Sequence, residues 1–282
     1  MQAGVGRNVA PGLRLEFKTE FADRRPLINH SDFSFYRKYR DYSPNSPLPS
    51  PSTEPEIPAF DSHKAFLLEL SARIRIKETF STYPDYRVYH SSKWPTLVLQ
   101  YTKAVPGLGG SVADFDLIQF RLSQNDLALG LFGYSEWNLG CGVFWRKNRV
   151  EFMDYYHPKG NQTVLGNPDI YVRSFFLLPY YEFSSSNAYA DIHWRHHFNG
   201  WLLDKIPGIR KLNWKEALSL NFYYADTYAT EQQTDRSLPY WEASFGFYNI
   251  GIKFFRPLHV NIAVGFFGND FYRTGLVLGV DL

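Results

Sequence analysis

The amino-acid sequence predicts an all-β fold, an antiparallel transmembrane β-barrel with about ten strands in the 282 residues. Apolar and polar residues alternate along most of the chain, as they do in barrel strands that face lipid on one side and water on the other. Aromatic residues make up 18% of the chain, which is typical of proteins that anchor at membrane interfaces. The sequence has no apolar run of the ~20 residues that a spanning helix needs, so any membrane crossing falls to strands.

The first predicted strand covers residues 13–21, where Leu13, Leu15 and Phe17 alternate with charged residues. A strand of a soluble β-sandwich would show the same pattern, with its charged face in water. The stretch 126–145 favours the membrane alternative, because a usual globular strand has only ~5–6 residues. The same alternation predicts further strands at 66–77, 97–101, 114–123, 188–198, 218–224, 241–247, 258–266 and 272–282.

The lengths of the connections predict the side of the membrane on which each one lies. Outer-membrane barrels keep long loops outside and short turns on the periplasmic side. If the last strand runs inward, the long connections 27–62, 146–186 and 226–237 lie outside, and Gln124-Asn125 forms a periplasmic turn. The stretch 43–58 is rich in proline and serine, which indicates that 27–62 is an exposed external loop.

Two connections fit this arrangement less well, because both would be long for periplasmic turns. In 199–213, apolar residues such as Trp201, Leu202 and Ile206 indicate a periplasmic segment that lies at the membrane interface. A packed turn would show the same residues, so both alternatives stay open. The pattern in 78–96 gives no assignment.

Charge and cysteine content exclude several classes of protein. The net charge of +2 gives no indication of a nucleic-acid partner. The single cysteine, Cys141, excludes an internal disulfide framework and a cysteine-rich metal site. The first residues lack the charged region, apolar core and cleavage site of a signal peptide. An exported protein with this start has lost its signal or is cut from a longer precursor.

Several short motifs carry a resemblance to a known family. They are Gly160-Asn161-Gln162-Thr163, the run from Phe175 to Ser184, His196-His197-Phe198-Asn199-Gly200 and the run from Lys205 to Leu212. With these motifs, the chain resembles a large, mostly uncharacterised group of outer-membrane barrel proteins, which often carry a carboxypeptidase-regulatory-like domain and are related to the BamA-like surface-antigen superfamily. The match spans nearly the whole chain, most strongly 155–255.

The resemblance implies a location in the bacterial cell outer membrane and contact with outer-membrane lipid. It also implies a sixteen-stranded barrel, of which residues 1–282 would be the C-terminal portion. Further barrel strands would then come from upstream sequence or from another chain.

In the superfamily, the sixth external loop folds back into the lumen, and its Val-Arg-Gly-Phe-like tetrad places an arginine beside acidic residues on the next two strands. The resemblance implies that 146–186 is this loop. Val172, Arg173, Ser174 and Phe175 look like the tetrad, with Ser174 departing from the family's glycine. The expected acidic partner on the next strand is His193 here, with Asp191 one step away. A buried arginine left unpaired would cost several kcal/mol.

A row of ionisable residues shares the polar face of the predicted strand 188–198. Asp191, His193, Arg195 and His197 all lie on this face. Two imidazoles and a carboxylate could bind a metal ion. However, alternate residues of a strand lie ~7 Å apart, and Arg195 would repel a cation. The pattern therefore favours a structural polar ladder over a metal site.

A complete enzyme site is not expected, and no catalytic residue or cofactor is assigned. A barrel lipid hydrolase would need a serine–histidine pair. Ser184, Ser185 and Ser186 lie near His193 in sequence, but strand geometry gives no reason for contact, and the chain has no Gly-x-Ser-x-Gly motif. Cys141 is expected on the lipid-facing side of its strand.

The sequence leaves three function classes. The first is a barrel of the assembly or translocation type, in which Arg173→Ala would damage folding or activity. The second is a passive or substrate-specific pore, which would tolerate that change. The third and least favoured is a barrel hydrolase. Likeness of fold favours the first class only by analogy.

Overall fold

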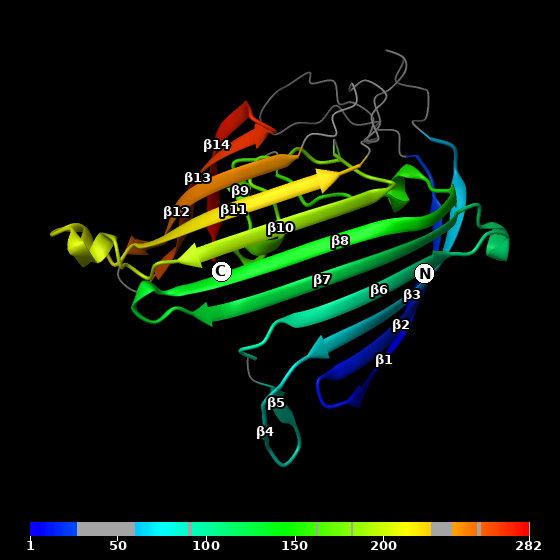
Figure 1. The fold of residues 1–282 in the computed structure, drawn as a ribbon, viewed down its shortest axis with the longest axis horizontal. Helices are drawn as coiled ribbons and strands as arrows, with labels where there is room; N and C mark the ends of the chain where they lie inside the picture. Colours follow the sequence, from blue (N-terminus) through cyan, green and yellow to red (C-terminus); the bar gives the residue numbers. More distant parts are fainter. Residues whose placement is uncertain are drawn as a thin grey trace.

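The computed structural model describes residues 1–26, 60–89, 92–161, 163–181, 183–226, 239–252 and 255–281. Their strands form one 12-stranded sheet and one two-stranded sheet. The large sheet follows the order β1-β2-β3-β6-β7-β8-β10-β11-β12-β13-β14-β9 (Figure 1). Its strands are β1 (Gln2–Ala10), β2 (Leu13–Arg24), β3 (His63–Arg75), β6 (Thr96–Ala104), β7 (Asp114–Ala128), β8 (Tyr134–Arg149), β9 (Leu165–Gly166), β10 (Ala188–His197), β11 (Lys215–Ala225), β12 (Tyr240–Ile252), β13 (Phe255–Phe267) and β14 (Asp270–Val280).

The all-β prediction is confirmed, and the sheet is antiparallel apart from the short parallel pairing of β14 with β9. Within the described residues the sheet is open, with β1 at one end and β9 at the other. Short 3-10 helices occur in its connections, and no helix among the described residues is long and apolar enough to cross a bilayer. They are η1 (Leu108–Gly110), η2 (Gly130–Phe132), η3 (Phe152–Asp154), η4 (Pro168–Arg173), η5 (Leu203–Lys205) and η6 (Ile209–Leu212).

The two faces of the sheet differ in chemistry, as the alternation predicted. On β10, Asp191, His193 and Arg195 are buried on one face, whereas Ile192 between them is 41% exposed on the other. We call these the inner face and the outer face. Cross-strand pairing carries the division along the sheet, because directly paired residues share a face. Cys141 lies on the outer face and is exposed, as expected.

The connection between β8 and β10, residues 150–187, packs against the inner face of the C-terminal strands. We call it the inserted segment, and Figure 1 shows it behind β10 and β11. Phe175, Leu178 and Phe183 share a hydrophobic core with Tyr223 and Tyr240 of the sheet. Burying a large apolar side chain contributes about 1.5–3 kcal/mol. The main core of the protein therefore lies between this segment and the sheet.

The predicted turn at Gln124-Asn125 is wrong. β7 continues to Ala128, and the chain turns at 129–133 instead. The register of β7 against β8 shifts between Gln124 and Leu127, and Asp126 has a positive φ of 56°. This β-bulge interrupts the alternation, and the polar residues around it resemble a turn in sequence. Gly133 ends the true turn, where a Cβ would lie 1.9 Å from the carbonyl oxygen of His197.

The prediction of about ten strands is also too low. β1 has few large apolar residues, and its place depends on pairing with β2, for example Val5 opposite Phe17. The unassigned stretch 78–96 forms the small hairpin of β4 (Phe80–Thr82) and β5 (Arg87–Tyr89). Tyr83 and Tyr86 stack in its turn with centroids 4.9 Å apart. The predicted external loops 27–62 and 226–237 lie almost entirely outside the described residues.

Candidate functional site

The carboxylate of Glu242 on β12 fixes the inserted segment to the sheet. Glu242 is fully buried. Its Oε1 accepts hydrogen bonds from the backbone amide of Phe176 at 2.6 Å and from Asn221 Nδ2 at 2.8 Å. Its Oε2 accepts from the amide of Leu177 at 3.0 Å and from the hydroxyl of Tyr240 at 2.7 Å. Four donors thus compensate one buried charge. Hydrogen bonds to an ionised group are stronger than those between neutral groups, so they can offset its burial.

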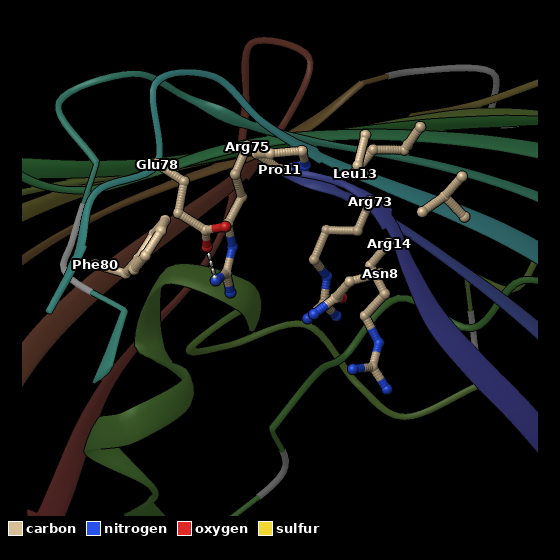
Figure 2. A pocket seen from close by; sticks show the side chains of 11 residues that line it. Asn8, Pro11, Leu13, Arg14, Arg73, Arg75, Glu78 and Phe80 are labelled. Atoms are coloured by element: carbon tan, nitrogen blue, oxygen red, sulfur yellow. Dashed lines mark hydrogen bonds and ion pairs between the residues drawn. The ribbon is translucent and has the colours of Figure 1, made fainter. Parts of the chain in front are cut away.

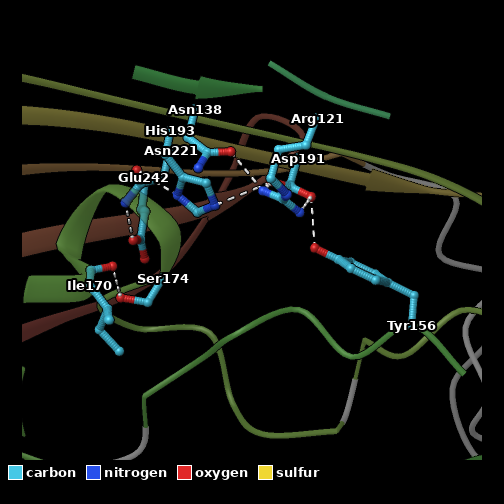
Figure 3. Close-up of polar contacts among 9 residues, drawn as sticks. All are labelled: Arg121, Asn138, Tyr156, Ile170, Ser174, Asp191, His193, Asn221 and Glu242. Carbon is cyan, nitrogen blue, oxygen red and sulfur yellow. Dashed lines mark hydrogen bonds and ion pairs between the residues drawn. The ribbon is translucent and has the colours of Figure 1, made fainter. Parts of the chain in front are cut away.

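A chain of polar contacts continues from Glu242 across β11 and β10 (Figure 3). Asn221 donates to Glu242 through Nδ2, so its Oδ1 accepts from Nδ1 of His193 at 3.0 Å. His193 Nε2 lies 3.6 Å from Oδ2 of Asp191. Asp191 in turn lies 3.3 Å from Nη1 of Arg121 and accepts from the hydroxyl of Tyr156 at 2.7 Å. We call these residues, with Asn138, the inner-face network.

The inner-face network contacts the inserted segment at both ends. Tyr156 lies near the start of the segment and stacks on Tyr189 with centroids 3.5 Å apart. Phe176 lies near its end, at Glu242. A third attachment joins the segment to the N-terminal strands, where the guanidinium of Arg24 on β2 donates to both oxygens of Asp154, at 2.7 and 2.6 Å. Such a bidentate pair fixes orientation as well as distance.

The proposed tetrad makes different contacts from those that the resemblance implies. Arg173 is exposed and makes no ion pair with another described residue, and Asp191 pairs with Arg121 instead. Ser174 Oγ donates to the carbonyl oxygen of Ile170 at 2.9 Å. Phe175 is buried, and its ring lies 4.6 Å from that of His193. Val172 is half-buried. The charge that holds this segment lies on the sheet, at Glu242, and its partners are backbone amides.

The residues of the polar ladder on β10 lie in three separate environments. Asp191 and His193 belong to the inner-face network. The guanidinium of Arg195 lies 4.8 Å from the ring centroid of Tyr171, a cation–π contact. His197 Nε2 lies 2.8 Å from Oε1 of Glu136. Because the side chains have different partners, they do not converge on one point, and the described residues include no group of three potential ligands placed for a metal ion.

Two serine–histidine contacts occur among the described residues, and both serines are buried: Ser135 Oγ lies 2.8 Å from Nδ1 of His196, and Ser184 contacts His157. Ser184 Oγ lies 2.6 Å from Nδ1 of His157 and donates to the carbonyl oxygen of Tyr181 at 2.7 Å. Ser184 is fully buried, so its hydroxyl is not accessible to a substrate. Sequence reasoning placed Ser184 near His193 and missed His157, which no motif marks.

The sequence could have indicated part of this site. Alternation places Glu242, Asn221 and Asp191 on the polar face of their strands, and an acidic residue on such a face needs a partner. Nothing in the sequence indicates that amides of a connection 65 positions away supply it.

Comparison with known proteins finds a family that this chain matches. Residues 1–247 match the family described as "Family of unknown function (DUF5686) C-terminal domain". No curated protein and no solved structure matches the chain. The description of the family mentions no membrane and no activity, so the outer-membrane resemblance stays a prediction. Because the match covers most of the chain, the protein belongs to the DUF5686 C-terminal domain family.

Proposed function

We propose that this chain forms the C-terminal portion of an integral outer-membrane β-barrel whose interior holds the inserted segment. The observation that carries the proposal is the outer face, where strand after strand exposes large apolar side chains. Soluble monomers rarely expose apolar patches above a few hundred Å², whereas lipid covers such a face in a barrel. Exposed members include Leu15, Phe17, Leu70, Leu99, Tyr101, Ile118, Phe120, Val143, Ile192, Leu220, Phe245, Leu258, Ile262 and Leu276.

The spacing of tryptophans on the outer face supports the same proposal. Trp145 is 78% exposed near one end of β8, and Trp241 stacks on Phe266 at the same rim. Trp137 pairs across strands with Trp194 toward the opposite rim. The eight residue steps from Trp137 to Trp145 span about 27 Å along a strand. At the usual tilt this corresponds to about 20 Å of thickness, close to the apolar band between the aromatic girdles of outer-membrane barrels.

The proposal implies two partners. Outer-membrane lipid covers the outer face, and further strands, from upstream sequence or another chain, pair with β1. A free sheet edge exposes unpaired amides and carbonyls, and a lipid environment does not tolerate such an edge. The family description as a C-terminal domain is consistent with upstream sequence.

Within this class, we favour an assembly or translocation role because the inserted segment is anchored to the sheet at three places. A passive or substrate-specific pore is the second candidate, and the two cavities on the inner face of the N-terminal strands support it. Planar-bilayer recordings separate the two. A pore conducts steadily in the wild type. In the favoured role the wild type stays closed, and Glu242→Gln, which weakens the attachment, raises conductance.

Brominated-lipid quenching tests membrane insertion directly. The chain is reconstituted together with its upstream sequence in vesicles with lipids brominated at mid-chain, and single-tryptophan variants retain Trp145, Trp137 or Trp214. We expect Trp137 and Trp145 on β8 to be quenched more strongly than Trp214, which precedes β11 beside η6. Equal and weak quenching of all three would contradict the proposal.

A further inference from the structure

Two adjoining cavities lie on the inner face of the N-terminal strands, in the part that the inserted segment does not fill. The larger measures about 540 Å³ and is lined by Arg73, Arg75, Arg121, Lys159 and Arg173, among others. The smaller measures about 450 Å³, shares Arg73 and Arg75, and adds Arg14. Figure 2 shows these three arginines beside one another at the smaller cavity. We call the two cavities together the basic cavity.

Most of the positive charge in the basic cavity has no compensating partner among the described residues. Arg75 pairs with Glu78 at 2.7 Å, and Arg121 pairs with Asp191 at 3.3 Å. The side chains of the other four cations make no hydrogen bond or ion pair within the described part of the chain. The described lining of the larger cavity includes no acidic residue. The four uncompensated cations are Arg14, Arg73, Lys159 and Arg173.

The register of the sheet places like charges directly opposite each other. Arg14 on β2 is the cross-strand partner of Arg73 on β3, and a like-charged pair in this position destabilises a sheet. Gly6 on β1 leaves room for the guanidinium of Arg14, because a Cβ there would lie 2.9 Å from its Nη2. Lys159 and Arg173 approach from the inserted segment. Two parts of the chain thus direct unpaired cations into one space.

We propose that the basic cavity binds a ligand that carries two or more phosphate groups. Guanidinium groups present paired N–H donors that match phosphate oxygens in bidentate fashion, which makes arginine the preferred residue for this chemistry. Four uncompensated cations suit more than one anionic group. Volumes of this size are typical of sites for small molecules. The ligand is a free phosphorylated compound or the headgroup of a phosphorylated lipid. This inference holds whether or not the sheet spans a membrane.

Calorimetric titration of the full 282-residue chain in a non-ionic detergent tests the proposal, with pyrophosphate and orthophosphate as probes. We expect pyrophosphate to bind at least about tenfold more tightly than orthophosphate, because a second phosphate adds charge-assisted contacts. Arg73→Gln and Arg173→Gln should each weaken pyrophosphate binding about tenfold. Arg210→Gln removes an exposed arginine of η6 outside the cavity and should leave the binding unchanged.

Mixed micelles that contain cardiolipin, a lipid with two phosphates, distinguish the two sources of ligand. If pyrophosphate displaces cardiolipin, the site accepts the lipid headgroup. If pyrophosphate binds and cardiolipin does not, the ligand is a free compound. Absence of binding by both probes at millimolar concentration overturns the proposal. Binding that Arg73→Gln and Arg173→Gln leave unchanged, with circular dichroism showing native strand content, overturns it as well.

Discussion

Individual residues of the inner face illustrate two ways of burying charge. Glu242 is compensated by four neutral donors, two of them backbone amides. Asp191 is compensated by the guanidinium of Arg121 and the hydroxyl of Tyr156. In both cases at least two of the partners belong to a distant part of the sequence, so these contacts fix tertiary structure rather than a local turn.

At Glu242, substitution by glutamine keeps the size of the side chain and replaces one accepting oxygen with a donor. At least one donor to that oxygen is then left unpaired in a buried place, which costs about 1–3 kcal/mol. We expect Glu242→Gln to lower the free energy of unfolding by this amount in urea titrations. Glu69→Gln, at the partly exposed Lys18–Glu69 pair, is the matched control and should cost less than about 1 kcal/mol. Equal losses in both variants would contradict this role of Glu242.

Gly140 is the cross-strand neighbour of both Arg121 and Asp191. A Cβ at this position would lie 2.6 Å from Oδ1 of Asp191 and 2.8 Å from Nη2 of Arg121. We expect Gly140→Ala to displace the ion pair and to destabilise the protein by about 1–3 kcal/mol, as overpacking does. Cys141→Ala, at the adjacent exposed position, should have little effect on the urea midpoint. If Gly140→Ala unfolds at the wild-type midpoint, the ion pair does not depend on this space.

Among the elements, the inserted segment is the one whose sequence pattern says least about its path. Its described residues form one two-residue strand and two 3-10 helices, and hydrophobic residues close to its end pack in the two core clusters. The sequence pattern of a strand is more informative, because one face of each strand is directed to the interior and the other to its surroundings. Predictions for these elements therefore concern the attachment of the segment and the chemistry of the outer face.

The attachment of the segment should depend on pH through His157. Burial of the imidazole lowers the pKa of His157 below its ordinary value of 6.5. The ordinary pKa of 6.5 applies to His157 in the unfolded chain. At a pH between this value and the lower pKa of the folded state, the unfolded chain binds more protons than the folded one. The contribution to stability is therefore complete above about pH 6.5 and is lost as the pH falls toward the folded-state pKa. In urea titrations from pH 7.5 to 5, we expect the wild type to lose more stability than His157→Gln. Parallel curves would exclude this dependence.

The strand β6 offers matched positions on its two faces. Leu99 is 42% exposed on the outer face, and Thr102 lies on the inner face opposite Glu69. In lipid vesicles, we expect Leu99→Lys to cost about 2–4 kcal/mol, because it places a cation in the hydrocarbon region. Thr102→Lys adds the same charge beside a carboxylate and should cost at most about 1 kcal/mol. If the exposed Leu99 tolerates lysine as well as Thr102 does, the outer face is not in lipid.

At the scale of the whole molecule, the described strands form a curved sheet with open ends (Figure 1). Twelve strands pair in one sheet, yet β1 has no second neighbour and β14 has only two paired residues on its far side within the described chain. A transmembrane barrel needs closure, so the proposed function requires more strands at these edges.

Gel mobility of boiled and unboiled samples tests closure. In detergent, we expect the 282-residue chain alone to be rich in strands by circular dichroism but to show no heat-dependent shift in mobility. Addition of upstream sequence should produce the shift, because closed barrels resist unfolding by detergent. A heat-dependent shift of the chain alone would show that its strands close unaided, and the inference of missing strands would be wrong.

The sequence by itself determined the all-β class, the two faces and the approximate position of most strands. The reason is that alternation is local: Leu99 and Gln100 take opposite faces wherever the strand pairs. The local pattern did not predict the course of β7 at the bulge near Asp126, where the backbone departs from regular strand geometry. It also did not predict β1, whose position depends on pairing with β2.

Only the tertiary structure decided how the inner face is occupied. Arg121 and Asp191 are 70 positions apart, and Phe176 and Glu242 are 66 apart. Their contacts follow from strand order and from the path of an irregular segment, neither of which has a periodic signal in sequence. The resemblance implies that Arg173 fixes the segment. The fold gives that part to the amides of Phe176 and Leu177, because a backbone group of any residue type can meet a buried carboxylate when the chain brings it there.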